Sequence, residues 1–311
     1  MQTVTRPPAP GARWPRPSRR RALRTGLLFV SPWIIGYCAF YLYPFLATFY
    51  YSFTRFTGIG NPVITGLSNY SALLHDQTFR TALFNTFYYT IIEVPLSTAA
   101  ALGLAILLNM NVRGQAFYRT LFYIPSIVPV VASSLIFVWV FEPSFGIVNS
   151  LLSDAHVNGP GWFFSITWSK PTFILLGLWG LGQPMVIYLA ALQGVPKEMY
   201  EVADLEGVGH WGRLRHITIP MISPVILFNV VLSLVLSIQY FTQAQVIENP
   251  PGSPGTSTMF YVTYYYQQAF QDLHLGYASA MAFLLFILVL IVTVLLLRSS
   301  SHWVYYENEQ R

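Results

Sequence analysis

Polar side chains recur on one face of an apolar segment near residues 220–247. Ser233, Ser237 and Tyr240 are spaced i, i+4 and i+7, so a helix places them on one face, with Gln243 close by. Such groups can hydrogen-bond the hydroxyls of a bound solute, and an aromatic ring can stack on its apolar side. The alternative is that Ser233 and Ser237 only allow helices to pack closely.

A second group with the same potential lies in the apolar segment 171–193. Trp179 and Gln183 share a helical face at i, i+4, beside Gly180 and Gly182. Polar and aromatic side chains converging inside a helix bundle are typical of a pathway for a polar solute. We therefore predict that these two side chains line the same pathway as the first group.

Glu93 is the one carboxylate inside an apolar segment, and it stands two residues before Pro95. A buried acid in a membrane suggests a functional role or a charged partner. Alternatively, Glu93 hydrogen-bonds the backbone that Pro95 leaves unpaired. The sequence does not decide between these two roles.

Groups for covalent chemistry are scarce. The two lysines, Lys170 and Lys197, do not stand in a G-x-x-x-x-G-K-[ST] phosphate loop. The six histidines form no H-E-x-x-H pair, and Cys38 is the single cysteine, so it has no partner for an internal disulfide. We expect no catalytic residue, no metal site and no cofactor in this chain, which leaves a membrane enzyme little support.

The elements that position these side chains must be membrane helices. Of the 311 residues, 54% are hydrophobic and only 9% are charged, too apolar for a water-soluble domain. A period-2 alternation typical of a membrane barrel is not apparent, and neither are inverted repeats with broken helices. We predict an all-α membrane protein with about six transmembrane helices, near residues 24–53, 82–109, 120–141, 171–193, 220–247 and 275–297.

The distribution of basic residues predicts the orientation. Seven arginines lie before or at the start of the first apolar segment, and most other Lys and Arg residues fall on the same side of the membrane when the segments alternate. Both termini are therefore expected in the cytoplasm. We expect residues 1–23 to form a disordered basic tail, residues 24–297 to form one six-helix domain, and residues 298–311 to form a cytoplasmic C-terminal tail.

The charged stretch "YEVADLEGVGHWGRLRHITIP", residues 200–220, lies between two apolar segments. Its pattern predicts an acidic helix that begins at Pro196, a corner at Gly207 and Gly209, and a short basic helix that ends before Pro220. Two such helices on the cytoplasmic surface can fill a groove on another protein. The alternative is an ordinary solvated loop whose charges set topology.

This stretch resembles the EAA loop of permease subunits in bacterial ATP-binding-cassette (ABC) importers. The loop pattern is roughly Y-E-A-A-x-x-D-G-A, about nine residues, then I-x-L-P, with departures here at Val202, Glu206, Val208 and Leu214. In that family the loop is the helix that couples to the ATPase. The resemblance implies a coupling loop over residues 196–220, with that role for Tyr200, Glu201, Ala203, Asp204, Gly207 and Pro220.

Longer segments, among them "YRTLFYIPSIVPVVASSLIFVWVFEPSFGIVN" and "QQAFQDLHLGYASAMAFLLF", resemble the first permease of carbohydrate importers of the maltose, lactose and glycerol-phosphate type. The resemblance implies type I ABC importer architecture in a bacterial cytoplasmic membrane, crossed several times by the chain. It also implies a saccharide or polyol substrate. One departure is "ENPPGSPG", where relatives carry a T-x-G-G-P turn.

The resemblance further implies the partners. These are a second homologous permease, two ATPase subunits that bind ATP and magnesium, an extracytoplasmic solute-binding protein and membrane lipid, with no nucleic acid. The maltose permease lines its sugar site from the fourth and fifth spans, which favours a pathway role for Trp179, Gln183, Ser233, Ser237, Tyr240 and Gln243. The remaining alternatives are the same architecture for a non-sugar solute, a secondary transporter, or a signalling or scaffold protein.

Overall fold

The computed structural model describes residues 19–110, 113–248 and 250–305, with the backbone alone for residues 19–22. The chain divides into two units, Met1–Tyr50 and Tyr51–Arg311. The first unit contains α1 (Arg19–Tyr37), the π-helical turn η1 (Cys38–Leu42) and most of α2 (Tyr43–Ser52). Helix α1 begins at Arg19, so residues 19–23 of the expected tail are helical, and residues 1–18 lie outside the described residues.

The second unit is helical apart from one short hairpin. Its first half contains β1 (Thr54–Arg55), β2 (Val63–Ile64), α3 (Ser68–His75), α4 (Gln77–Asn109), α5 (Gln115–Ile127), α6 (Val130–Val140), α7 (Ile147–Asp154), η2 (Trp162–Phe164) and α8 (Ser169–Gly177). Its second half contains η3 (Leu178–Gly180), α9 (Gly182–Gln193), α10 (Lys197–Leu205), α11 (His210–Arg213), η4 (Leu214–Thr218), α12 (Ile219–Ile238), α13 (Thr242–Ile247), α14 (Tyr261–Tyr266), η5 (Gln267–Gln271) and α15 (Leu275–Ser300).

The helices match the six predicted membrane segments. Four stretches are long and apolar enough to cross a membrane, namely Leu23–Ser52, Gln77–Asn109, His210–Ile247 and Leu275–Ser300. The pairs α5 with α6 and α8/η3 with α9 each complete a further span if a bent pair counts as one. Helix α15 extends to Ser300, into the expected C-terminal tail, and residues 306–311 lie outside the described residues.

Two of the predicted spans are bent. Helices α5 and α6 meet at 98°, and α8/η3 and α9 meet at 50°. Pro129 follows Val128, which is held in an extended conformation (φ −65°, ψ 129°) because a residue before proline avoids the helical region. The second bend falls between Gly180 and Gly182, where the chain tightens into the 3₁₀ turn η3.

The N-terminal end of α4 is fixed by Asp76. Its Oδ1 accepts the backbone N–H groups of Thr78 (2.8 Å) and Phe79 (3.2 Å), and its Oδ2 accepts the hydroxyls of Tyr264 and Tyr277, each at 2.5 Å. Burial alone raises the pKa of the Asp76 carboxyl, but these four hydrogen bonds outweigh burial and hold that pKa below its ordinary value. One carboxylate thereby joins α4, α14 and α15.

The hairpin packs on the start of α15. Thr54 pairs with Ile64 and Arg55 with Val63, and the Gly276 amide donates to the Phe56 carbonyl at 3.0 Å. A Cβ atom at Gly276 would lie 2.0 Å from the Thr54 carbonyl oxygen, so only glycine permits this approach.

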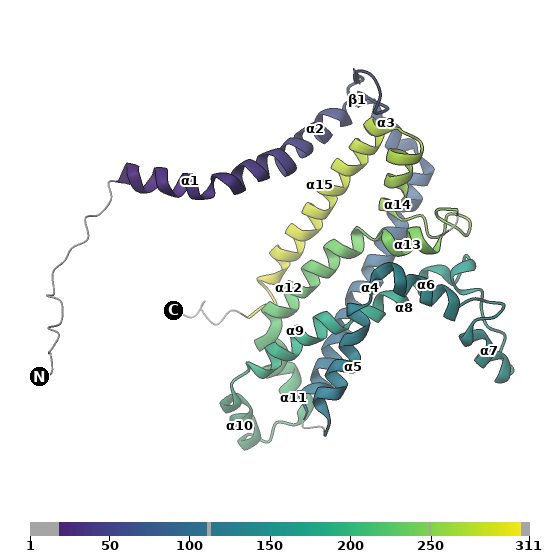
Figure 1. The fold of residues 1–311 in the computed structure, drawn as a ribbon. Coiled ribbons are helices and arrows are strands. Elements are labelled where there is room, and N and C mark those ends of the chain that lie inside the picture. The colour runs from purple at the N-terminus through teal and green to yellow at the C-terminus, as the bar shows by residue number, and fades with distance from the viewer. Residues whose placement is uncertain (1–18, 111–112, 249, 306–311) are drawn as a thin grey trace, which may run out of the picture. The chain divides into compact units, whose positions relative to one another are not determined.

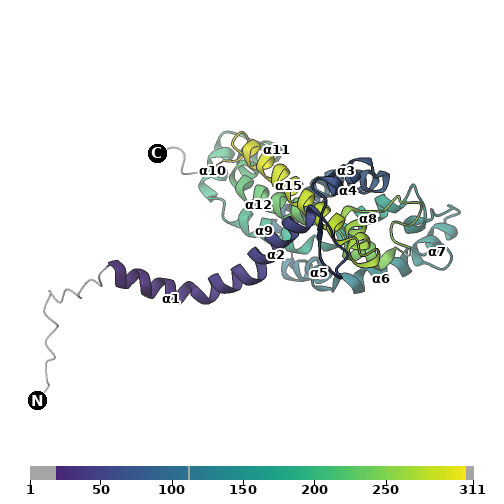
Figure 2. The ribbon, with the colours of Figure 1, turned by 90° about the horizontal axis from the view of Figure 1, so that it is seen from above.

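The two ends of the second unit differ in structure, as Figures 1 and 2 show: α10 and α11 lie at one end, and α6 and α7 at the other. The last described residues return to the first of these ends, where the Tyr305 amide donates to Ser223 Oγ at 2.9 Å. The charged stretch and the C-terminal end of α15 therefore lie at the same end of the unit, as the predicted orientation requires.

Candidate functional site

The charged stretch forms a folded corner between α10 and α11. Helix α10 ends at Leu205, and Gly207 then takes a left-handed conformation with φ +69°. The Val208 amide donates to the Ala203 carbonyl at 2.9 Å and the Gly207 amide to the Asp204 carbonyl at 3.2 Å, which satisfies carbonyls left open at the helix end. The predicted glycine corner is confirmed at Gly207.

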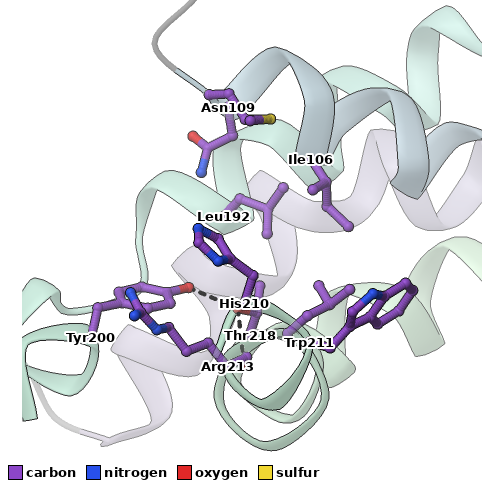
Figure 3. A pocket seen from close by; sticks show the side chains of 10 residues that line it. Ile106, Asn109, Leu192, Tyr200, His210, Trp211, Arg213 and Thr218 are labelled. Carbon is purple, nitrogen blue, oxygen red and sulfur yellow. Dashed lines mark hydrogen bonds between the residues drawn. The ribbon is translucent and has the colours of Figure 1, made fainter. Parts of the chain in front are cut away.

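Side chains hold the two sides of the corner together, as Figure 3 shows for Tyr200, Arg213 and Thr218. The Arg213 guanidinium pairs with the Asp204 carboxylate, and Arg213 Nε donates to the Val208 carbonyl at 2.7 Å. The hydroxyls of Tyr200 and Thr218 lie 3.0 Å apart. These three contacts hold α10 and the following turn together as one unit.

We expect Arg213→Gln to loosen this corner without unfolding the helix bundle. The change removes the ion pair with Asp204 and the hydrogen bond to Val208, together worth about 1–2 kcal/mol for a partly exposed group. Hydrogen exchange of residues 197–218 should become about tenfold faster. Arg215→Gln removes the same charge from an exposed side chain and should leave the exchange unchanged; equal exchange in both variants would contradict this assignment.

The corner presents both a pocket and an apolar edge. A pocket of about 450 Å³ lies beneath it, lined by the ends of α4 and α9 at Ile106 and Leu192 and by Trp211 of α11. Figure 3 shows Trp211 on the far side of the pocket from Tyr200. On α10, Ala203 is buried, while Val202 is 60% and Leu205 is 89% exposed. Apolar side chains this exposed at a charged surface are typical of a contact with another protein.

The basic half of the corner is not a separate helix. Helix α11 passes through the π-helical turn η4 directly into α12, so the chain is helical from His210 to Ile238. Pro220 lies inside this continuous helix, directly after the π-helical turn, and its missing N–H leaves one backbone carbonyl of the preceding turn without its usual partner. The expected break before Pro220 is therefore wrong, and the corner is rigidly continuous with a membrane span.

A second pocket lies within the membrane-spanning part of the unit. It has a volume of about 390 Å³ and is lined by α4, α6, α8, α12, α13 and the residues that join α12 to α13. Its polar lining comes from Tyr89, Glu93, Ser233, Ser237, Gln239, Tyr240, Thr242 and Gln243. Four of the six predicted pathway residues thus share one pocket.

Irregular backbone surrounds this pocket. Glu93 stands two residues before Pro95 of α4, Val130 follows the 98° bend, and Gln239–Phe241 separates α12 from α13. Non-helical backbone at membrane depth is tolerated where it is buried in protein or lines a water-filled cavity. Gly177 permits the close approach of α8, because a Cβ atom there would lie 2.9 Å from the Tyr89 hydroxyl. The bend, the break between α12 and α13 and the close approach at Gly177 therefore shape this pocket.

The Tyr240 hydroxyl is the most informative polar group in the pocket. Tyr240 is only 6% exposed, and its hydroxyl has no hydrogen-bond partner among the described residues. Its ring lies against Tyr89 at a centroid separation of 4.4 Å. A buried hydroxyl without a partner costs free energy, which a bound solute with hydroxyl groups would offset.

A protein-family model matches about two thirds of the chain. Residues 94–303 match the family described as "Binding-protein-dependent transport system inner membrane component". The chain belongs to this family. The matched range includes the whole corner and every lining residue of the membrane pocket except Tyr89 and Glu93.

Individual members of this transport family match almost end to end. The probable ABC transporter permease protein YesP of Bacillus subtilis is 35% identical over 94% of this chain and 96% of its own length. The arabinooligosaccharides permease AraP of Bacillus subtilis is 32% identical, covering 88% of each chain. The lactose permease LacF of Rhizobium radiobacter is 33% identical, over 87% of this chain and 92% of its own.

A solved member of the fold supports the helical architecture. A chain of a bacterial ABC transporter for import of the acidic polysaccharide alginate superposes with a TM-score of 0.79 at 22% identity, covering 91% of this chain and 98% of that one. At this identity the match concerns the fold alone. The all-α transmembrane architecture of an ABC importer permease is thereby confirmed.

The structure separates the predicted site residues of this permease into groups. Tyr200, Glu201, Ala203, Asp204 and Gly207 lie together in α10 and the corner, with Pro220 at the start of α12. Ser233, Ser237, Tyr240 and Gln243 line the membrane pocket. Their functional roles stay predictions.

Two predicted pathway residues do not line that pocket. Trp179 packs edge-on against Phe137 at 5.3 Å, and Gln183 is exposed. The i, i+4 spacing does not hold them on one face because the 3₁₀ turn and the 50° bend lie between them. The sequence prediction did not include Tyr89 in the site, and it left the role of Glu93 open.

Proposed function

We propose that this chain is the transmembrane permease subunit of an ATP-driven, binding-protein-dependent importer for a saccharide or polyol derivative in a bacterial cytoplasmic membrane. The observation that carries this proposal is the corner at residues 197–218, which exposes Val202 and Leu205 and continues without a break into α12. The substrate class is supported by the named substrates of its relatives, arabinooligosaccharides and lactose.

The partners follow from the same proposal. The chain itself catalyses no covalent step and holds no cofactor; two separate ATPase subunits bind ATP and Mg²⁺ and receive α10 in a groove. A second homologous permease forms the other half of the pathway, and an extracytoplasmic binding protein delivers the solute.

The geometry supports a direct route from the ATPase to the solute. When the ATPase subunits close, they pull on α10, whose contacts through Arg213 and Thr218 carry the movement into η4 and α12. Ser233 and Ser237 on α12 line the membrane pocket. Rigid-body rotation of this helix against its counterpart would expose the pocket alternately to the two sides of the membrane.

The test is co-purification of the tagged chain in mild detergent, followed by ATPase assays with solute-binding protein loaded with candidate sugars. The proposal expects an ATPase subunit in the purified complex and a several-fold stimulation by a sugar-loaded receptor. Stimulation only by receptors loaded with amino acids or peptides would identify the non-sugar alternative. A chain that purifies without any ATPase would overturn the proposal.

We expect Tyr240→Phe to weaken solute transport without destabilising the protein. The substitution removes a buried hydroxyl that has no protein partner, so the thermal unfolding midpoint should stay the same or rise. Loss of one hydrogen bond to the solute should raise the transport KM about three- to tenfold. Uptake of radiolabelled substrate into proteoliposomes measures this change.

Tyr188→Phe is the matched control. Tyr188 is also fully buried with an unpartnered hydroxyl among the described residues, but it packs with Ala101, Ala105 and Ile222, away from the pocket. Its transport KM should equal that of the unmodified chain. Equal KM values for both variants would exclude a solute contact at Tyr240.

A further inference from the structure

Glu93 gives the membrane pocket the one carboxyl group among its described lining residues. Its side chain is 9% exposed and lines the pocket, where its Oε1 would lie 3.3 Å from a Cβ atom at Gly177. It forms no ion pair in the described part of the chain; its hydrogen-bonding neighbour is the hydroxyl of Ser97, which also donates to the Val94 carbonyl at 3.2 Å. The structure therefore leaves the Glu93 carboxyl facing the pocket without a basic partner.

No positive charge balances this group. Among the described residues that line the pocket, none is Lys, Arg or His. Lys170 on α8 lies over the rings of Phe84 and Tyr88, 5.3 and 5.2 Å from their centroids, and is not part of the lining. The aromatic faces of α4 hold this ammonium group outside the pocket.

The other polar groups of the lining are neutral. Ser237 Oγ donates to the Leu234 carbonyl at 3.0 Å, which leaves its oxygen free to accept, and the Tyr240 hydroxyl is unpartnered among the described residues. Gln239 and Gln243 add amide donors and acceptors. Such groups suit the hydroxyls of a sugar, but they offer no countercharge to a carboxylate on the solute.

We infer that this half of the pathway admits neutral and cationic saccharides and rejects acidic ones, with Glu93 as the specificity-determining residue. The inference rests on the proposed function and deepens it. A sugar carboxylate entering the pocket would lose its hydration without gaining a positive partner and would lie near another carboxyl group. A sugar ammonium group would instead gain an opposite charge in a poorly hydrated site.

The test measures binding of three labelled probes of equal length to the complete transporter in detergent, without binding protein. The probes are a neutral trisaccharide of glucose, a cationic trisaccharide of glucosamine and an acidic trisaccharide of galacturonic acid, compared by equilibrium dialysis at low ionic strength. We expect the cationic probe to bind at least as well as the neutral one. The acidic probe should bind about tenfold more weakly or not at all, as expected for one unit charge at an effective dielectric constant near 20.

Matched variants separate charge from shape. Glu93→Gln keeps the size of the side chain and should abolish the advantage of the cationic probe and reduce the discrimination against the acidic probe about threefold; the acidic probe still finds no positive partner in the pocket. Glu93→Asp keeps the charge and should preserve the order of the probes. Glu142→Gln removes the same charge from α6's outer end, where Glu142 accepts from Ser144, and should change nothing.

Three outcomes would overturn the inference. Equal binding of the neutral and acidic probes to the unmodified transporter, or an unchanged ratio in Glu93→Gln, would show that Glu93 does not select by charge while leaving the saccharide importer intact. If none of the probes binds, the saccharide pocket itself is wrong and the inference fails with it. ATPase co-purification distinguishes that case from failure of the importer assignment.

Discussion

Replacement of Gly207 by valine is expected to uncouple ATP hydrolysis from transport while the helix bundle stays folded. Gly207 has φ +69°, a conformation in which a β-branched residue is strained by about 1–3 kcal/mol. A Cβ atom there would meet no atom within 4 Å, so the effect comes from the backbone alone. The corner would relax to another conformation, and α10 would no longer face the ATPase correctly.

Coupled uptake in proteoliposomes should fall more than tenfold in Gly207→Val, since about 1.4 kcal/mol already corresponds to a factor of ten. Two controls isolate the cause. Gly207→Asn should keep most of the activity, because asparagine tolerates the left-handed conformation. Gly60→Val introduces the same strain at φ +81° in the hairpin loop, also without a steric contact, and should leave coupling unchanged.

Normal coupled uptake in Gly207→Val would contradict a mechanical role for this corner. Uptake lost equally in Gly207→Val and Gly60→Val would attribute the effect to general destabilisation.

The double substitution Val202→Ser and Leu205→Ser is expected to detach the ATPase from the permease. Both side chains are exposed in this chain, so the free energy of unfolding should change by less than about 0.5 kcal/mol per site. Burial of each in a partner is worth about 1.5–3 kcal/mol, and loss of both should weaken the complex by a hundredfold or more. Co-purification at fixed detergent and salt concentrations measures the loss.

A matched control is Leu151→Ser on α7. Leu151 is 65% exposed but belongs to α7, which lies on the other side of the unit from α10, as Figure 2 shows for the two helices. This variant should retain the ATPase in full. Full retention in the double variant as well would mean that the apolar edge of α10 is not the docking surface.

The sequence predicted an all-α membrane protein, its six apolar segments, and an acidic helix that ends at a glycine corner. These features depend on local properties of the sequence. They are an apolar run of about 20 residues, the side of the membrane on which the Lys and Arg residues gather, and a glycine at the end of a helix. The helix of residues 197–205 and the left-handed Gly207 fall where the pattern placed them. The family resemblance, read from the same stretch, agrees with the match over residues 94–303.

Only the tertiary structure decided which side chains share the membrane pocket. Helical periodicity describes one helix at a time, so it placed Ser233, Ser237 and Tyr240 together but could not bring Tyr89 and Glu93 of α4 beside them. Periodicity also fails across a bend, which is why Trp179 and Gln183 do not line the pocket. The neighbours of a buried group depend on the packing of distant helices, and that packing leaves Glu93 facing the pocket and keeps Lys170 out of it.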